Sequence, residues 1–273
     1  MPHTKTTDIN IHYQHSGTGC PVLFLGGVGG DLRSQSNVFD SYLADRFEIL
    51  AFDQRGTGLT DKPDETYTMA QYAQDAAAVM DAVNWKSAHV TGVSFGGMVA
   101  QELAIRYPQR VRSLVLCCTA AGGAGGSSYP IHDLSDLSPP ERSRKMLAIG
   151  DDRYNESWQT GNPEETGRML KEAAANASPF LSEPGGITGI THQIEARSHH
   201  DTFDRLPAIQ VPTLVCGGEF DRQARPEVVR NLHGQITDAE LRFFAGGHNF
   251  LSQDPDAYKA ISGFIERHCS APG

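Results

Sequence analysis

A serine in the position of a nucleophile stands at residue 94, inside the pentapeptide Gly-Val-Ser-Phe-Gly of residues 92–96. An apolar, strand-like run (residues 88–93) precedes it, and a helical pattern (residues 98–107) follows it. A strand, a sharp turn and a helix in this order expose a serine hydroxyl at the apex of the turn. The flanking glycines fit a place where strand and helix come too close for larger side chains. We therefore predict that Ser94 is a nucleophile rather than a helix-capping serine.

A candidate acid and a candidate base follow two later strand-like runs. Asp221 comes after residues 212–217, and His248 comes after residues 239–244. A serine hydroxyl is a weak nucleophile at neutral pH, so a neutral imidazole must take its proton. A carboxylate must hold the other imidazole N–H, because that contact sets the tautomer and stabilises the imidazolium. The order of the chain therefore predicts Ser94 as nucleophile, His248 as base and Asp221 as the carboxylate that orients the base.

Other carboxylates compete for the role of the acid. Glu219 lies two residues before Asp221, in the same loop. Asp53 and Asp61 lie in loops that precede Ser94, which is the wrong order along the chain. We expect Asp53 and Asp61 to structure loops or cap helices.

Two backbone N–H groups are needed to hold the oxyanion that forms when Ser94 attacks a carbonyl group. The Phe95 N–H, near the start of a helix, faces the space in front of the serine in such a turn. The second donor is expected from the glycine-rich loop of residues 26–30, where Val28 is the best candidate. This loop lacks the Gly-Lys-Ser/Thr sequence of a phosphate-binding loop.

Two arginines of the middle segment, Arg144 and Arg197, are candidates for binding a substrate carboxylate through both ends of the guanidinium group. The competing interpretation places both on solvated helix faces. His199 and His200 are adjacent on a predicted helix, so they point to different faces and make a poor metal chelate. We expect surface polar groups at a hinge there, and we predict no metal site.

The elements that must position these residues alternate between strands and helices. After an antiparallel edge strand at residues 9–14, the strand patterns cover residues 21–25, 47–52, 88–93, 113–118, 212–217 and 239–244. The helix patterns between and after them begin at residue 68, at Met98, at Pro226, and at Asp254-Pro255. Such alternation predicts an α/β fold with a mostly parallel central sheet flanked by helices.

Residues 121–204 interrupt this alternation. They show helical patterns near residues 139–149, 163–177 and 186–200, without a strand pattern. We predict an α/β core formed by residues 1–120 and 205–273, with residues 121–204 inserted as a helical cap.

Composition excludes several other classes of protein. The chain of 273 residues carries a net charge of −10 and has no cluster of Lys and Arg, so we expect no nucleic-acid partner. It shows no signal peptide and no apolar run of membrane-spanning length, which predicts a cytoplasmic location without a membrane partner. The five cysteines lack ligand-like spacing, and we expect reduced thiols. The composition is compatible with a homo-oligomer.

These motifs resemble the α/β-hydrolase superfamily over nearly the whole chain. The resemblance rests on the turn at residues 92–97, the Asp-Gln-Arg-Gly-Thr-Gly loop of residues 53–58, the acid strand at residues 212–221 and Gly247-His248. Within the superfamily, the chain is most similar to 3-oxoadipate enol-lactonase-like esterases and lactonases. Many members carry His-Gly before the oxyanion residue, whereas this chain has Gly26-Gly27.

The residues and the resemblance together predict a cofactor-independent serine hydrolase that cleaves a small carboxylic ester or lactone. Serine at position 94 argues against haloalkane dehalogenases and epoxide hydrolases, which resemble this family but use aspartate there. Hydrolysis of C–C bonds in meta-cleavage products and peroxyacid formation would use the same triad, so both stay open. A catalytically silent receptor or scaffold of the same fold is the alternative that is not an enzyme.

Overall fold

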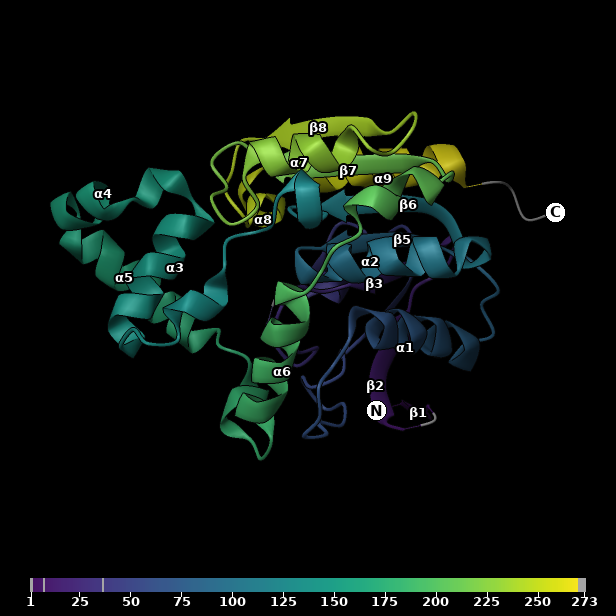
Figure 1. Ribbon diagram of the computed structural model, residues 1–273, viewed down its shortest axis with the longest axis horizontal. Helices are drawn as coiled ribbons and strands as arrows, with labels where there is room; N and C mark the ends of the chain where they lie inside the picture. Colours follow the sequence, from purple (N-terminus) through teal and green to yellow (C-terminus); the bar gives the residue numbers. More distant parts are fainter. Residues whose placement is uncertain (1, 7, 36, 270–273) are drawn as a thin grey trace.

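An eight-stranded sheet in the order β1-β2-β4-β3-β5-β6-β7-β8 forms the centre of the protein (Figure 1). This computed structural model describes residues 2–6, 8–35 and 37–269. The strands are β1 (His3–Lys5), β2 (Asn10–Ser16), β3 (Pro21–Leu25), β4 (Glu48–Phe52), β5 (Ala88–Val93), β6 (Val111–Cys117), β7 (Thr213–Gly218) and β8 (Glu240–Phe244).

All neighbouring strands from β4 to β8 are parallel, and the antiparallel pairs are β1 with β2 and β2 with β4. The predicted fold class, an α/β fold with a mostly parallel sheet, is confirmed. The alternating residues 9–14 do form an antiparallel strand, β2. The prediction that this strand lies at the edge is wrong, because the short β1 pairs with its outer side and takes that place.

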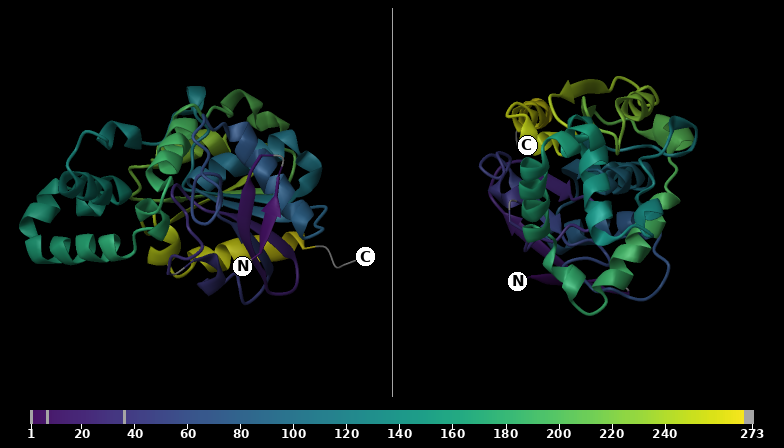
Figure 2. Two further views of the ribbon diagram at one scale, coloured as in Figure 1. Left: turned by 90° about the horizontal axis from the view of Figure 1, so that it is seen from below. Right: turned by 90° about the vertical axis from the view of Figure 1, so that its left-hand side faces the viewer.

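Helices cover both faces of the sheet. Helices α1, α2 and α7 lie on one face, and α9 lies on the other (Figure 2). The core helices are α1 (Met69–Ala82), α2 (Phe95–Arg106), α7 (Pro226–His233), α8 (Phe250–Gln253) and α9 (Ala257–His268). The central strands pack between these layers, so β5 and β6 are buried almost along their whole length.

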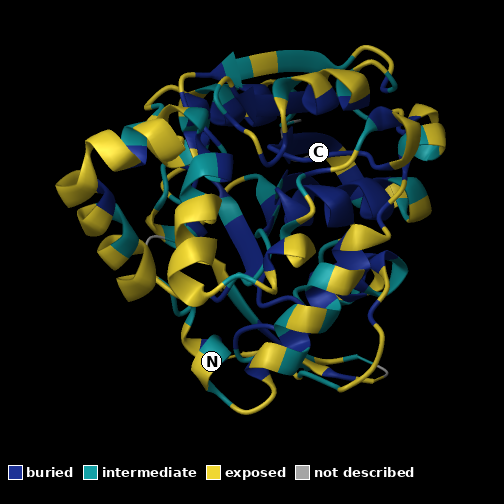
Figure 3. Ribbon diagram, turned by 60° about the vertical axis from the view of Figure 1, so that its left-hand side comes forward, coloured by how far each residue is buried: buried dark blue, intermediate teal, exposed yellow. Residues whose placement is uncertain are grey.

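The chain between β6 and β7 contains helices and no strand among its residues, all of which the structure describes. Its helices are α3 (Pro139–Gly150), α4 (Glu156–Gly161), α5 (Pro163–Ala175) and α6 (Gly186–Ser198), with short 3₁₀ turns between them. Helices α3 to α5 extend to one side of the sheet and are largely exposed, whereas α6 lies against the core (Figure 1 and Figure 3). We refer to residues 121–204 as the cap; its boundaries stay a prediction.

Local sequence signals account for most helix ends. Thr68 caps α1 and forms the predicted capping box with Gln71. Helix α2 begins at Phe95, earlier than the periodic pattern from Met98 predicts, because the turn at Ser94 leads directly into it.

The predicted start of the last helix is wrong. Asp254 ends the short α8 and accepts a hydrogen bond from the Ala245 N–H through Oδ2, at 2.9 Å. Helix α9 therefore starts later, with Asp256 as its N-cap residue.

The prediction of reduced thiols is wrong for two of the five cysteines. Cys20 and Cys269 form a disulfide, with their Cα atoms 6.2 Å apart, while Cys117, Cys118 and Cys216 are free and buried. The two partners are 249 residues apart in sequence. Only the folded sheet, with the end of α9 beside the start of β3, brings them together. Among the described residues, no helix is both long and apolar enough to span a bilayer.

Candidate active site

The turn between β5 and α2 holds Ser94 in a strained conformation. Its φ of 54° and ψ of −115° lie outside the regions that non-glycine residues usually adopt. A Cβ on Gly92 would lie 2.3 Å from the Gly96 carbonyl oxygen, and one on Gly96 would lie 2.1 Å from the Leu25 carbonyl oxygen. Both flanking positions therefore require glycine, as the pentapeptide predicts.

Neighbouring β6 fixes this turn through two hydrogen bonds. The Ser94 N–H donates to the Cys117 carbonyl oxygen, and the Thr119 hydroxyl donates to the Ser94 carbonyl oxygen, both at 2.8 Å. Strain of this kind persists only where the surroundings hold it, and it is typical of functional sites.

Ser94, His248 and Asp221 form one continuous hydrogen-bonded relay. The Ser94 Oγ lies 2.9 Å from His248 Nε2, and His248 Nδ1 lies 2.8 Å from Asp221 Oδ2. The Asp221 side chain is fully buried, whereas Ser94 is 8% exposed. The structure thus brings together the three predicted residues, which follow three different strands.

The Asp221 carboxylate is held by the backbone of its own loop. Its Oδ1 accepts hydrogen bonds from the N–H groups of Gln223, at 2.7 Å, and Ala224, at 2.9 Å. This arrangement leaves Oδ2 to accept the proton on His248 Nδ1, which makes Nε2 the acceptor that faces Ser94.

The rival carboxylates lie elsewhere. Glu219 is exposed, and no hydrogen bond joins its side chain to His248 among the described residues. Asp53 accepts hydrogen bonds from Leu32 N, Leu59 N and His12 Nδ1. Burial raises the pKa of Asp53, and these contacts hold two loops together. Asp61 accepts from the Asn10 backbone N–H and side-chain amide. Asp53 and Asp61 therefore structure loops, as expected.

Gln223 is a neighbour of the base that the sequence did not reveal. Its side-chain amide nitrogen lies 3.0 Å from His248 Nε2, the same ring nitrogen that faces Ser94. Its only signal in the sequence is its place two residues after Asp221. The contact restricts the imidazole on the side opposite Asp221.

The glycine-rich loop of residues 26–30 lies beside the nucleophile. A Cβ on Gly27 would be 3.6 Å from the Ser94 Cβ, so Val28 follows directly after the point of closest approach. Phe95 is the first residue of α2, and the first N–H groups of a helix have no partner inside the helix. Assignment of the Val28 and Phe95 N–H groups to an oxyanion hole stays a prediction.

Cap residues hold the glycine-rich loop in place through hydrogen bonds. The Gly29 N–H donates to Gln193 Oε1 of α6 at 2.7 Å, and the Ser178 hydroxyl donates to the Gly29 carbonyl oxygen at 2.7 Å. Arg33, just after the loop, pairs with Asp31 and with Glu183 of the cap. The cap is therefore joined to the loop that carries the candidate oxyanion donor.

The end of α3 contacts the loops of the acid and the base. The His248 N–H donates to the Gly150 carbonyl oxygen at 2.6 Å, and the Arg222 N–H donates to the Ile149 carbonyl oxygen at 3.0 Å. A Cβ on Gly247 would lie 2.1 Å from the Gly150 oxygen, so this approach requires glycine before the histidine.

The two arginines that were candidates for carboxylate binding lie in different surroundings. Arg144 is exposed and lines a cavity of about 600 Å³ between α3, α4 and Arg222. Arg197 is 5% exposed and lines a separate cavity of about 210 Å³ near Met98. The structure does not bring these two side chains to one cavity.

The two histidines that follow α6 differ in their exposure to solvent. His199 is exposed, but His200 is buried, so the expectation of surface polar groups is wrong for His200. Chain segments entering and leaving the cap meet there: the Thr202 N–H donates to the Ala121 carbonyl oxygen at 2.8 Å.

One group among the described residues has metal-ligand types close together, namely Cys20, His89 and Cys269, with ligand atoms within 4.8 Å of one another. The disulfide occupies both sulfur atoms of this group. It therefore does not fit a thiolate metal site, and none of its members belongs to the relay.

Comparison with known proteins places this chain in a family. The alpha/beta hydrolase fold family matches residues 21–255. The chain is 38% identical over 261 residues to a putative non-heme bromoperoxidase, BpoC, of Mycobacterium tuberculosis, covering 91% of this chain and 94% of that protein. It is 28% identical over 271 residues to a putative carbamate hydrolase, RutD, of Azorhizobium caulinodans, covering 96% of each.

A solved structure agrees on the fold. The enol-lactonase of Burkholderia xenovorans LB400 superposes with a TM-score of 0.74 over 97% of this chain and 98% of that chain, at 22% identity. The named relatives differ in the reactions that their names describe. The comparisons therefore support a hydrolase without identifying its substrate.

Proposed function

Because this chain belongs to the alpha/beta hydrolase fold family, we propose that it is a serine hydrolase that cleaves a small carboxylic ester or lactone through an acyl-enzyme intermediate. The observation that carries the proposal is the relay from Ser94 through His248 to Asp221, with contacts of 2.9 and 2.8 Å. A hydroxyl, an imidazole and a carboxylate in this order are the groups that activate serine at neutral pH.

In the first step, His248 Nε2 takes the hydroxyl proton while the Ser94 Oγ attacks the carbonyl carbon. The carbonyl oxygen becomes an oxyanion, for which the N–H groups of Phe95 and Val28 are the proposed donors. Loss of one such donor typically costs about 2.7–4 kcal/mol of transition-state stabilisation. His248 then gives its proton to the leaving alkoxide, and the acyl group stays on Ser94.

In the second step, water attacks the acyl-enzyme. His248 takes a proton from this water, a second tetrahedral intermediate forms, and its collapse releases the acid and restores the Ser94 hydroxyl. With a lactone, the alcohol and the acid are two ends of the same product. The chain's own side chains supply every proton transfer in this cycle.

Replacement of Ser94 by alanine tests the proposal. We expect Ser94→Ala to abolish hydrolysis of p-nitrophenyl acetate because no other hydroxyl faces His248 Nε2 among the described residues. Its thermal unfolding should stay close to that of the wild type, since Ser94 makes no side-chain helix cap. Retained turnover in the folded variant would contradict the proposal. Wild-type protein without any Ser94-dependent turnover would favour a scaffold instead.

A second candidate, peroxyacid formation, is favoured by the relative named as a non-heme bromoperoxidase. Hydrogen peroxide would replace water: one of its oxygens bonds to the acyl carbon while His248 takes the proton from that oxygen. The bond to Ser94 Oγ then breaks, His248 returns the proton to Oγ, and a peroxyacid leaves. The peroxyacid then oxidises bromide to hypobromite and becomes the carboxylic acid. Ser94-dependent bromination that requires both hydrogen peroxide and a carboxylic acid would support this candidate, and its absence would exclude it.

A further inference from the structure

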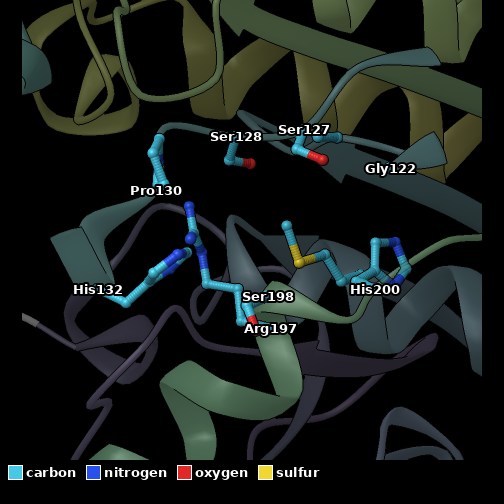
Figure 4. Close-up of a pocket in the computed structure, with 10 residues that line it drawn as sticks. Gly122, Ser127, Ser128, Pro130, His132, Arg197, Ser198 and His200 are labelled. Atoms are coloured by element: carbon cyan, nitrogen blue, oxygen red, sulfur yellow. The ribbon is translucent and has the colours of Figure 1, made fainter. Parts of the chain in front are cut away.

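A small cavity lies where the cap meets the nucleophile helix. It has a volume of about 210 Å³, and its walls come from the start of α2, the chain entering the cap and the end of α6. Figure 4 shows Arg197 with its guanidinium group pointing into the space between His132, Pro130 and Ser128. Ser127 and Ser128, which precede Pro130 in the same segment of the chain, also line the cavity. Asp and Glu are absent from the described residues that line it.

Arg197 has no counter-charge among the residues that the structure describes. No carboxylate of the described residues pairs with it, and within the same residues its hydrogen bond runs from Nη2 to the Tyr129 carbonyl oxygen at 2.9 Å. Its Nε is buried without a partner. Because buried arginines are normally paired, an unpaired one that faces a cavity indicates a place for an anion.

The charge on Arg197 persists at neutral pH. Burial lowers the pKa of its guanidinium group to about 10, which still leaves the group a cation at pH about 7. The planar fork of an arginine matches the two oxygens of a carboxylate.

Residues around the cavity are hydrogen-bonded to Ser94 and to Gln223, the neighbour of His248. Met98, on its wall, donates its backbone N–H to the Ser94 carbonyl oxygen at 3.3 Å. Tyr129, whose carbonyl oxygen holds Arg197, donates its N–H to the Gln223 carbonyl oxygen at 2.7 Å. The Gln223 side chain in turn contacts His248. The surroundings of the cavity are therefore bonded to the backbone of the nucleophile through Met98 and to the neighbour of the base through Tyr129.

Resting on the ester or lactone hydrolase function proposed above, we propose that Arg197, with the hydroxyl groups of Ser127 and Ser128, binds a carboxylate carried by the substrate. The favoured substrates are then esters or lactones of a dicarboxylic type, in which one carboxyl group is free. The same site would accept a free carboxylic acid as a competing ligand.

The test uses two p-nitrophenyl esters of glutaric acid that differ only in charge. One has a free carboxylate at the far end, and in the other that end is a methyl ester. The wild type should prefer the charged ester in kcat/KM by tenfold or more, as hydrogen bonds to charged groups allow. Arg197→Met should remove most of this preference through a higher KM for the charged ester. Arg168→Met, an exposed arginine of α5, should keep it.

A second measurement tests whether a free carboxylic acid binds at the same place as the carboxylate of the substrate. Glutarate should raise the melting temperature of the Ser94→Ala protein, should inhibit the wild type competitively, and should do neither when Arg197 is replaced by methionine. Glutarate that binds through Arg197 without competing would overturn the assignment to substrate. Equal preference for the two esters in wild type and Arg197→Met would overturn the site itself. Hydrolysis of the methyl ester that depends on Ser94 leaves the proposed function intact in either case, whereas its absence would overturn that function.

Discussion

At the residue scale, the Asp221 carboxylate divides its two oxygens between the backbone and the base. Oδ1 accepts two backbone N–H groups, so an asparagine here must place its amide oxygen at that position. The amide NH₂ would then face His248 Nδ1 and force the proton onto Nε2, which could no longer accept the proton of Ser94.

We therefore expect Asp221→Asn to lower kcat/KM for p-nitrophenyl acetate by about 10³- to 10⁴-fold, with little change in melting temperature. Steady-state kinetics on the purified variant checks this. Glu219→Gln is the matched control, because that side chain is exposed and should leave kcat/KM near the wild-type value. Loss of activity in Glu219→Gln instead would mean that the acid is assigned wrongly.

Residues that follow strands were predictable, and residues that act across elements were not. Ser94, Asp221 and His248 each stand where a parallel strand ends, and that rule alone brings them to one edge of the sheet. Gln223 reaches His248 only because of the path of its loop, and no spacing along the chain encodes that path. The isolation of Arg197 from the carboxylates that the structure describes depends on the packing of α6. The sequence could therefore only suggest Arg197 and Arg144 together as candidates.

At the scale of elements, the cap and the core share the loop that carries the candidate oxyanion donor. Gln193 of α6 is fully buried, and its Oε1 accepts the Gly29 N–H at 2.7 Å. This bond fixes the backbone next to Val28. The sequence predicted α6 as a helix, but the face that meets the loop follows from how the cap folds back onto the core.

We expect Gln193→Met to lower kcat for a neutral ester by about tenfold, because loss of the acceptor leaves the half-buried Gly29 N–H unpaired and frees the loop to move. KM should change less than kcat, since the loop acts on the transition state. Thr191→Ala, an exposed change on the same helix, is the control. A variant with unchanged kcat would show that the loop holds its position without α6.

Several element boundaries differ from prediction for local reasons. Helix α4 was not predicted because its six residues are too few to show a periodic pattern. Asp254 and Pro255 carry the signature of a helix start, yet Asp254 ends α8, whose Phe250 stacks on Phe244 with ring centroids 5.2 Å apart. At Asp254, tertiary packing outweighs the local signal.

At the scale of the whole molecule, stability in acid depends on buried histidines. His89 is fully buried, lies 2.8 Å from the Ser113 hydroxyl through Nδ1, and has a pKa that burial lowers to about 4. In the unfolded chain it titrates near its ordinary pKa of 6.5. The unfolded state therefore binds more protons between these two values, and the free energy of unfolding falls as pH decreases from about 6.5 to about 4.

We expect His89→Gln to flatten this dependence, even where the variant is less stable at neutral pH. Urea unfolding measured at several pH values between about 7 and about 5 gives the slope. His199→Gln, at an exposed histidine, should keep the wild-type slope. Identical slopes in wild type and His89→Gln would contradict a neutral, buried His89.

The overall architecture was the most predictable feature, since alternating strands and helices allow few arrangements. The disulfide between Cys20 and Cys269 could not be predicted, because residues so distant in sequence meet only through the order of strands and the path of α9. How α3 to α5 extend beside the core could not be predicted either (Figure 3).

The central claim, that Ser94 is an activated nucleophile, is tested most directly by covalent labelling with a fluorophosphonate. The wild-type protein should gain one phosphonyl group by intact mass, peptide mapping should place it on Ser94, and Asp221→Asn should label far more slowly. Folded wild-type protein that stays unlabelled, or that carries the label at another residue, would contradict the account.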